Sequence, residues 1–92
     1  MNIDDIVFDS ELKLLKKGEV YLFSDSYGAL KHYDRNLSHI ENNKLNKKMG
    51  YVYKGRLKSI SKNRNCPFVF ESNYELDPIN PVIDSCTFAC RI

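Results

Sequence analysis

Three segments in the first three quarters of the chain carry the β-branched and aromatic residues that are typical of strands. Residues 19–24 have the sequence Glu-Val-Tyr-Leu-Phe-Ser and are followed by a turn-forming Asp-Ser-Tyr-Gly sequence. Residues 49–60 predict a long strand, and residues 66–72 predict a shorter one with a proline near its start. Because residues 61–65 are a short link, we expect the second and third of these strands to form a hairpin.

A fourth strand is predicted at residues 84–92, after a loop at residues 74–81 that contains two prolines. Its side chains alternate in character, as in a strand with one buried face. The positions predicted to face the core are Cys86, Phe88, Cys90 and Ile92. This strand would complete the sheet.

One amphipathic helix is predicted at residues 29–41, with Asn42 and Asn43 as its end. Its apolar positions recur at i, i+3, i+7 and i+10, and they are Leu30, Tyr33, Leu37 and Ile40. Residues 9–17 are compatible with two structures. They could form a short helix that ends at Gly18, or an extended segment that leads into a turn there.

Together these elements predict a single α+β domain over residues 1–92. It would contain a small antiparallel sheet of about four strands, arranged as a meander, with one or two short helices. The composition, 42% hydrophobic and 28% charged, is typical of a folded domain. No apolar run reaches the roughly 18 residues of a membrane span, and the first residues are acidic where a secretory signal would be basic. We therefore expect a cytoplasmic protein that does not contact a membrane.

The formal net charge of +2 hides a strong segregation of charge. Residues 1–41 have a net charge of −3, residues 71–92 also have −3, and the segment between them has +8 with no acidic residue. Such a segment attracts polyanions or acidic protein surfaces. The basic residues predicted to bind a partner or nucleic acid are Lys44, Lys47, Lys48, Lys54, Arg56, Lys58, Lys62 and Arg64.

Three of these bases share one face of the predicted strand at residues 49–60, because side chains alternate along a strand. Lys54, Arg56 and Lys58 would be about 6.6 Å apart, which is similar to the ~6–7 Å between phosphates of an extended nucleic-acid strand. Val52 and Ile60 would share this face, and the core-facing positions would be Tyr51, Tyr53 and Leu57. The alternative is a solvated face that only keeps the sheet soluble, and the sequence leaves both open.

Catalytic and metal-binding motifs are absent from the sequence. There is no glycine-rich phosphate loop, no His-Glu-x-x-His and no Gly-x-Ser-x-Gly motif. Cys86 and Cys90 would lie about 13 Å apart on a strand, too far to share a zinc ion with bonds of about 2.3 Å. Cys66 makes the cysteine count odd, which suits reduced thiols. We expect a non-enzymatic protein without a metal, a cofactor or a small-molecule substrate.

Several stretches resemble small phage-encoded all-β or α+β proteins with a Tudor-like or Src-homology-like curved sheet. They are Gly-Glu-Val-Tyr-Leu-Phe-Ser-Asp at residues 18–25, Gly-Arg-Leu at 55–57 with Pro-Phe at 67–68, and Cys-Thr-Phe-Ala-Cys-Arg-Ile at 86–92. Residues 29–48 depart from that pattern by adding the predicted helix. In size and lack of catalytic motifs, the chain also resembles the anti-CRISPR proteins, which are small phage proteins that bind a CRISPR effector complex and block it.

Anti-CRISPR proteins share no common motif, so the resemblance assigns no role to any residue. It implies a stoichiometric inhibitor in the host cytoplasm that binds a host CRISPR effector–guide RNA complex and prevents target DNA from binding. The basic segment would then contact the nucleic-acid backbone or an acidic surface. Two alternatives remain open, a free-standing nucleic-acid-binding phage regulator and a structural or assembly protein of a virion.

Overall fold

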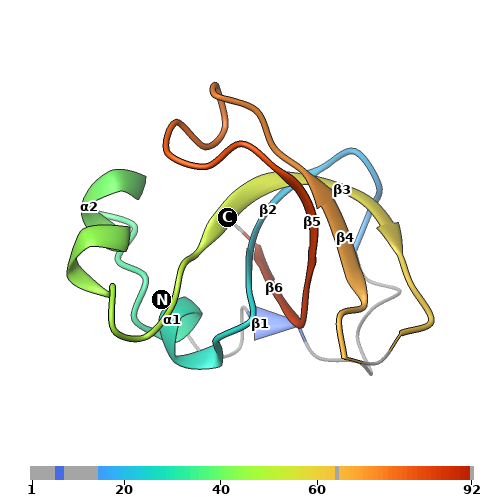
Figure 1. Ribbon diagram of the computed structural model, residues 1–92, viewed down its shortest axis with the longest axis horizontal. Helices are drawn as coiled ribbons and strands as arrows, with labels where there is room; N and C mark the ends of the chain where they lie inside the picture. The colour runs from blue at the N-terminus through green and yellow to red at the C-terminus, as the bar shows by residue number, and fades with distance from the viewer. Residues whose placement is uncertain (1–5, 8–14, 64, 92) are drawn as a thin grey trace.

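In the described part of the chain, six strands form one antiparallel sheet, with two short helices beside it (Figure 1). The structure is a computed structural model that describes residues 6–7, 15–63 and 65–91. In chain order the elements are β1 (Ile6–Val7), β2 (Val20–Ser24), α1 (Tyr27–Lys31), α2 (His39–Leu45), β3 (Tyr53–Ile60), β4 (Phe68–Glu71), β5 (Ile83–Cys86) and β6 (Phe88–Arg91). The predicted α+β class is confirmed. No helix in the described part of the chain has the length and apolar character needed to cross a membrane.

The sheet has the strand order β1-β6-β2-β3-β4-β5. Strands β2 to β5 follow one another as neighbours, so the predicted meander and the β3–β4 hairpin are confirmed. The strand at residues 19–24 is also confirmed, as β2, whereas the long strand begins at Tyr53 and not at residue 49. The alternative structures for residues 9–17 lie mostly outside the described residues; within them, Leu15 is buried and a turn forms at Lys17 and Gly18.

The predicted single strand at residues 84–92 is wrong, because the chain turns a corner at Thr87. Cys86 pairs with Phe68 of β4, whereas Phe88 pairs with Ser24 of β2. The Thr87 backbone N–H donates to the carboxylate of Asp25 (3.0 Å), and its hydroxyl donates to the carbonyl of Asn65 (2.7 Å). These contacts stabilise the corner. After it, Phe88 and Cys90, which were predicted to face the same side as Cys86, face the opposite side of the sheet.

Among the described residues, two hydrophobic cores result, one on each face of the central strand β2. The phenylalanine core consists of Leu15, Tyr21, Phe23, Leu57, Phe68, Phe70, Cys86 and Ala89. The α1 core consists of Leu22, Ala29, Leu30, Tyr33, Val52 and Cys90, with Phe88 packed against it. The prediction that Cys86, Phe88 and Cys90 share one face is therefore wrong, and Ile92 lies outside the described residues.

The phenylalanine core is an aromatic stack enclosed by the curved sheet. The rings of Phe23 and Phe70 are 4.5 Å apart and nearly parallel, at 8°. Burying a side chain of this size stabilises the fold by about 1.5–3 kcal/mol. Strand β4 approaches β3 so closely that a Cβ atom on Gly55 would lie 2.8 Å from the carbonyl oxygen of Glu71. A glycine at residue 55 therefore permits the pairing of these two strands.

A β-bulge in β3 corrects the predicted alternation of its faces. Leu57 pairs with Phe70 and Ser59 pairs with Val69, which leaves Lys58 as the extra residue. Ile60 is thereby turned toward the phenylalanine core, although the sequence placed it on the face of the basic residues.

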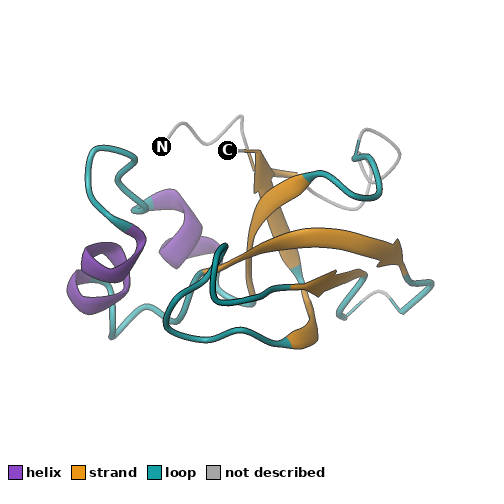
Figure 2. Cartoon of the chain, turned by 90° about the horizontal axis from the view of Figure 1, so that it is seen from above, coloured by secondary structure: helices purple, strands orange, loops and turns teal. Residues whose placement is uncertain are grey.

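The predicted helix at residues 29–41 is also wrong: Leu30 lies in α1 and Ile40 in α2, whereas Tyr33 and Leu37 lie in the segment between the two helices. α1 is capped by Ser26, whose hydroxyl accepts from the N–H of Ala29 (3.2 Å), and it ends at Lys31. α2 is capped by Ser38 and continues through Asn42 and Asn43, the predicted end. Between them, Asp34 accepts from the N–H of Asn36 (2.9 Å), a local turn that competes with helix. Both helices lie at the same end of the molecule (Figure 2).

Candidate interaction surface

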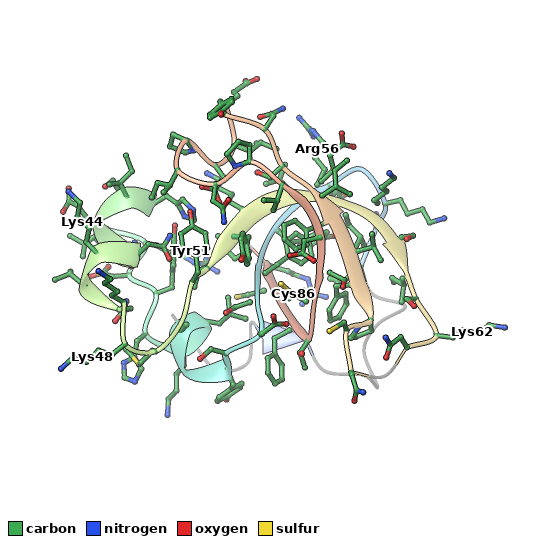
Figure 3. All side chains as sticks on the ribbon, viewed as in Figure 1. Lys44, Lys48, Tyr51, Arg56, Lys62 and Cys86 are labelled. Atoms are coloured by element: carbon green, nitrogen blue, oxygen red, sulfur yellow. The ribbon has the colours of Figure 1, made fainter. Side chains whose placement is uncertain are left out.

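The structure separates the predicted basic residues instead of gathering them into one surface. Lys44 lies on α2 and Lys48 just beyond it, at one end of the long axis, whereas Lys62 lies at the opposite end (Figure 3). Arg56 projects from a third place, on β3 (Figure 3). Arg64 lies outside the described residues. Two separate basic groups therefore exist, one at α2 with Lys44, Lys47 and Lys48, and one along β3 and the loop that follows it.

The three bases that were predicted to form a regular row have different surroundings. Lys54 is half-buried and lines a cavity of about 300 Å³ beside Tyr33 and His39. Arg56 is exposed, and its guanidinium donates to the carbonyl of Gly18 (3.1 Å). Lys58 is exposed at the bulge, which interrupts the regular spacing of the strand. Their arrangement is less regular than the even spacing that the sequence suggested.

α2 is attached to the rest of the protein mainly through amide side chains. Asn42 is buried; its side-chain oxygen accepts from the N–H of Asp34 (2.6 Å), and its amide nitrogen donates to the carbonyl of Asp34 (2.8 Å). Asn43 binds the backbone of Val52 in the same two-sided way, with distances of 2.9 and 3.1 Å. Each amide satisfies both a donor and an acceptor of the backbone beside it.

A buried polar network of Tyr33, His39, Tyr51 and Asp77 fixes the start of α2. His39 Nε2 lies 3.1 Å from Asp77 Oδ2, and the hydroxyl of Tyr51 donates to Asp77 Oδ1 (2.9 Å). Because a carboxylate only accepts, Nε2 of His39 carries the proton and Nδ1 can accept from the hydroxyl of Tyr33, 2.9 Å away. The network joins α2 to the 73–82 loop and to the segment that leads into β3.

Asp77 is the centre of this network and has no solvent exposure. Besides its side-chain partners, it accepts from the backbone N–H groups of Lys54, Ile79 and Asn80 (3.3, 3.2 and 3.1 Å). Burial by itself would raise the pKa of the Asp77 carboxyl, but the hydrogen bonds from His39 and Tyr51 hold that pKa below its usual value. Burial is the larger cause that raises the pKa of the Tyr51 hydroxyl, and the hydrogen bond to the Asp77 carboxylate raises it further.

The two sides of α2 differ in chemistry. Its inward side is polar, whereas its outward side carries aliphatic and cationic residues. Ile40 is 41% exposed and Leu45 is 72% exposed, although the helix buries Asn42. Ile40 and Ile79 of the 73–82 loop, which is 45% exposed, both line a groove of about 340 Å³. This α2 groove is lined by Ile40, Asn43, Lys44, Lys47, Tyr51 and Ile79.

Sequence reasoning missed the residues that hold this surface. His39 falls within the predicted helix at residues 29–41 and Asp77 within the predicted loop at residues 74–81, and the sequence patterns give neither residue a role. One signal was present, since two adjacent asparagines in a helical pattern indicate side chains that bond to neighbouring backbone. The pattern could not reveal that Ile40 faces outward, because that depends on where the 73–82 loop packs.

The described residues contain no group of three or more His, Cys, Asp or Glu side chains placed to hold a metal ion. Cys66, Cys86 and Cys90 are free cysteines. Burial raises the pKa of the Cys86 thiol, which disfavours the reactive thiolate. Comparison with protein-family models, with curated proteins and with solved structures finds no match for this chain.

Proposed function

We propose that the chain is a non-enzymatic inhibitor that binds its target through the α2 end of the molecule and acts by remaining bound. The target we propose is a host CRISPR effector–guide RNA complex, which would be prevented from binding its target DNA. The observation that carries the proposal is the outward side of α2, where exposed aliphatic residues lie beside Lys44 and Lys47. Apolar anchors among charges are typical of protein interaction sites.

Rigid attachment of α2 supports this proposal. Asn42, Asn43 and the buried polar network hold the helix in one position before any partner arrives. A surface that is already ordered loses less conformational entropy on binding, and a larger share of the contact energy then appears as affinity.

The charge at this end supports an acidic or polyanionic target. Lys44, Lys47 and Lys48 lie within five residues, in a segment without acidic residues. All three are exposed. Such a group attracts negative surfaces over about 8–10 Å at physiological salt and raises the association rate.

The environment of His39 supports a binding role over a catalytic one. Both ring nitrogens are engaged, Nδ1 with Tyr33 and Nε2 with Asp77, and the side chain is only 9% exposed. A general base needs access to the proton that it removes. In this arrangement the imidazole joins α2 to the 73–82 loop.

A titration of purified protein against a panel of CRISPR effector–guide complexes, with labelled target DNA, tests the function. Inhibition should be complete near an equal molar ratio and should not increase with time of incubation. Reversing Lys44, Lys47 and Lys48 to Glu should weaken inhibition and its salt dependence. The matched control reverses Arg56, Lys58 and Lys62, an equal change of charge elsewhere, and should inhibit normally. Unimpaired DNA binding across the panel at large excess would overturn the proposal.

A second candidate is the free-standing nucleic-acid-binding phage regulator. Arg56, Lys58 and Lys62 favour it, because all three are exposed along β3 and the following loop. In that case the isolated protein should shift nucleic acid in a gel without any effector complex. The roles of the two charge-reversal variants would also be exchanged, with the β3 variant losing binding.

A further inference from the structure

The α2 groove has an apolar centre and a cationic rim. Ile40 from α2 and Ile79 from the 73–82 loop both line it, and both side chains are more than one-third exposed. Lys44 follows Ile40 by one turn of α2, and Lys47 lies in the turn that follows the helix; both lysines line the groove. An opening of about 340 Å³ accommodates one or two side chains of a partner.

Two residues that line the groove, Tyr51 and Asn43, are already held by contacts within the protein. Tyr51 donates its hydroxyl to Asp77, and its ring contacts Tyr53 at 4.7 Å and His39 at 6.2 Å between centroids. Asn43 is fixed by its two hydrogen bonds to Val52. The groove therefore keeps its shape without a ligand, as preformed binding sites do.

These features favour a peptide over a nucleic acid. Binding of single-stranded nucleic acid relies on exposed rings on which bases stack, whereas the ring of Tyr51, which lines the groove, is held within contacts of its own. Two exposed isoleucines in the lining instead match an aliphatic or aromatic side chain. The lysines at the rim match carboxylates placed before and after that side chain.

We propose that the α2 groove binds an acidic peptide segment of a protein partner, with one large apolar side chain between Ile40 and Ile79 and carboxylates beside Lys44 and Lys47. The inference rests on the proposed function. It states that the groove recognises a protein segment of the target and not the guide RNA or the DNA. The apolar contact fixes the position of the segment, and the charges select its sequence.

Selection from a random 12-residue peptide display library tests the proposal. The full-length protein is the bait, and the Ile40→Ser/Ile79→Ser variant removes peptides that bind elsewhere. The control bait is Ile83→Ser, because Ile83 is 64% exposed on β5 and does not line the groove. Peptides with Asp or Glu on both sides of Leu, Ile or Phe should be enriched. No enrichment, or enrichment of basic or purely polar peptides, would overturn the inference.

The affinity of an enriched peptide then identifies the groove as its site. Ile40→Ser/Ile79→Ser should weaken binding at least about tenfold, as the loss of an interface anchor does. Lys44→Gln/Lys47→Gln should weaken it less and remove most of its salt dependence, whereas Ile83→Ser should bind like wild type. Equal affinity of all variants would overturn the proposal. Displacement of the bound peptide by a 20-nucleotide RNA would also overturn it. So would self-association of the protein in sedimentation experiments that is lost in Ile40→Ser/Ile79→Ser.

The two proposals fail in different ways. If the groove binds acidic peptides but no effector complex is inhibited, the groove inference stands and the CRISPR target is wrong. If effector complexes are inhibited equally by wild type and Ile40→Ser/Ile79→Ser, the CRISPR target stands, whereas the groove inference and the aliphatic contact at α2 are overturned.

Discussion

The two helices of this protein are both short and lie at the same end of the molecule, yet they are attached in opposite ways (Figure 2). α1 buries apolar side chains, with Ala29 and Leu30 fully inaccessible. α2 buries Asn42 and directs Ile40 and Leu45 toward solvent. When a helix is attached by apolar contacts, its hydrophobic residues are buried in the core. A polar attachment leaves them available to a partner, and α2 is therefore suited to binding while α1 stabilises the fold.

The largest expected effect follows from removing an apolar contact of α1. Leu30→Ala should lower the free energy of unfolding by about 2–5 kcal/mol, because the side chain is fully buried and leaves a cavity. Leu45→Ala on α2 is the control, and it should change stability by no more than about 0.5 kcal/mol. Urea denaturation of both variants measures the difference. Similar losses from the two changes would show that the helices are not attached differently.

The next effect concerns the polar attachment of α2. Asp77→Asn should cost about 1–3 kcal/mol, because an amide group cannot accept all the hydrogen bonds that converge on this buried carboxylate. The loss should be local. Amide hydrogen exchange should accelerate in α2 and in the 73–82 loop more than in β2.

Asp84→Asn is the matched control for that change, because Asp84 is an exposed aspartate on β5. It should leave both stability and exchange near wild type. Uniform acceleration of exchange across the sheet in Asp77→Asn would contradict a local role for the network.

Acid should weaken the α2 attachment before the apolar cores. The folded-state pKa of Asp77 lies below its unfolded value of about 3.9, so the carboxylate contributes stability above that value. This contribution is lost as the pH falls through the folded-state pKa. The difference in stability between wild type and Asp77→Asn should therefore shrink between about pH 5 and pH 2. A difference that stays constant over this range would mean that the charge of Asp77 does not stabilise the fold.

Much of the sheet could be predicted from sequence because its signals are local. Residues 19–24, 49–60 and 66–72 contain the patterns of strands, and β2, β3 and β4 lie within them. The corner at Thr87 could not be predicted, since the apolar alternation continues through it. The chain turns there because Asp25 and Asn65, distant in sequence, bind Thr87.

The candidate site was less predictable, because basic residues that are close in the sequence are far apart in the structure. The basic segment spans α2, β3 and the loop after it, and the length of β3 carries Lys62 away from Lys44 (Figure 3). The helical period joined Leu30 and Ile40 into one face. Asn42 prevents that helix, because its side chain binds the backbone of the turn at Asp34.

The smallest expected effect on stability comes from a change on the outward side of α2. This change tests most directly whether α2 serves binding while α1 serves stability. Ile40→Ser should cost less than about 1 kcal/mol, because Ile and Ser have similar helix propensities and the side chain is already partly solvated. The melting temperature should therefore stay close to that of wild type, while the enriched peptide binds weakly. Loss of binding without loss of stability is expected of a residue that serves a partner. A loss of stability as large as that of Leu30→Ala would place Ile40 in the core, and α2 would then be a second structural helix.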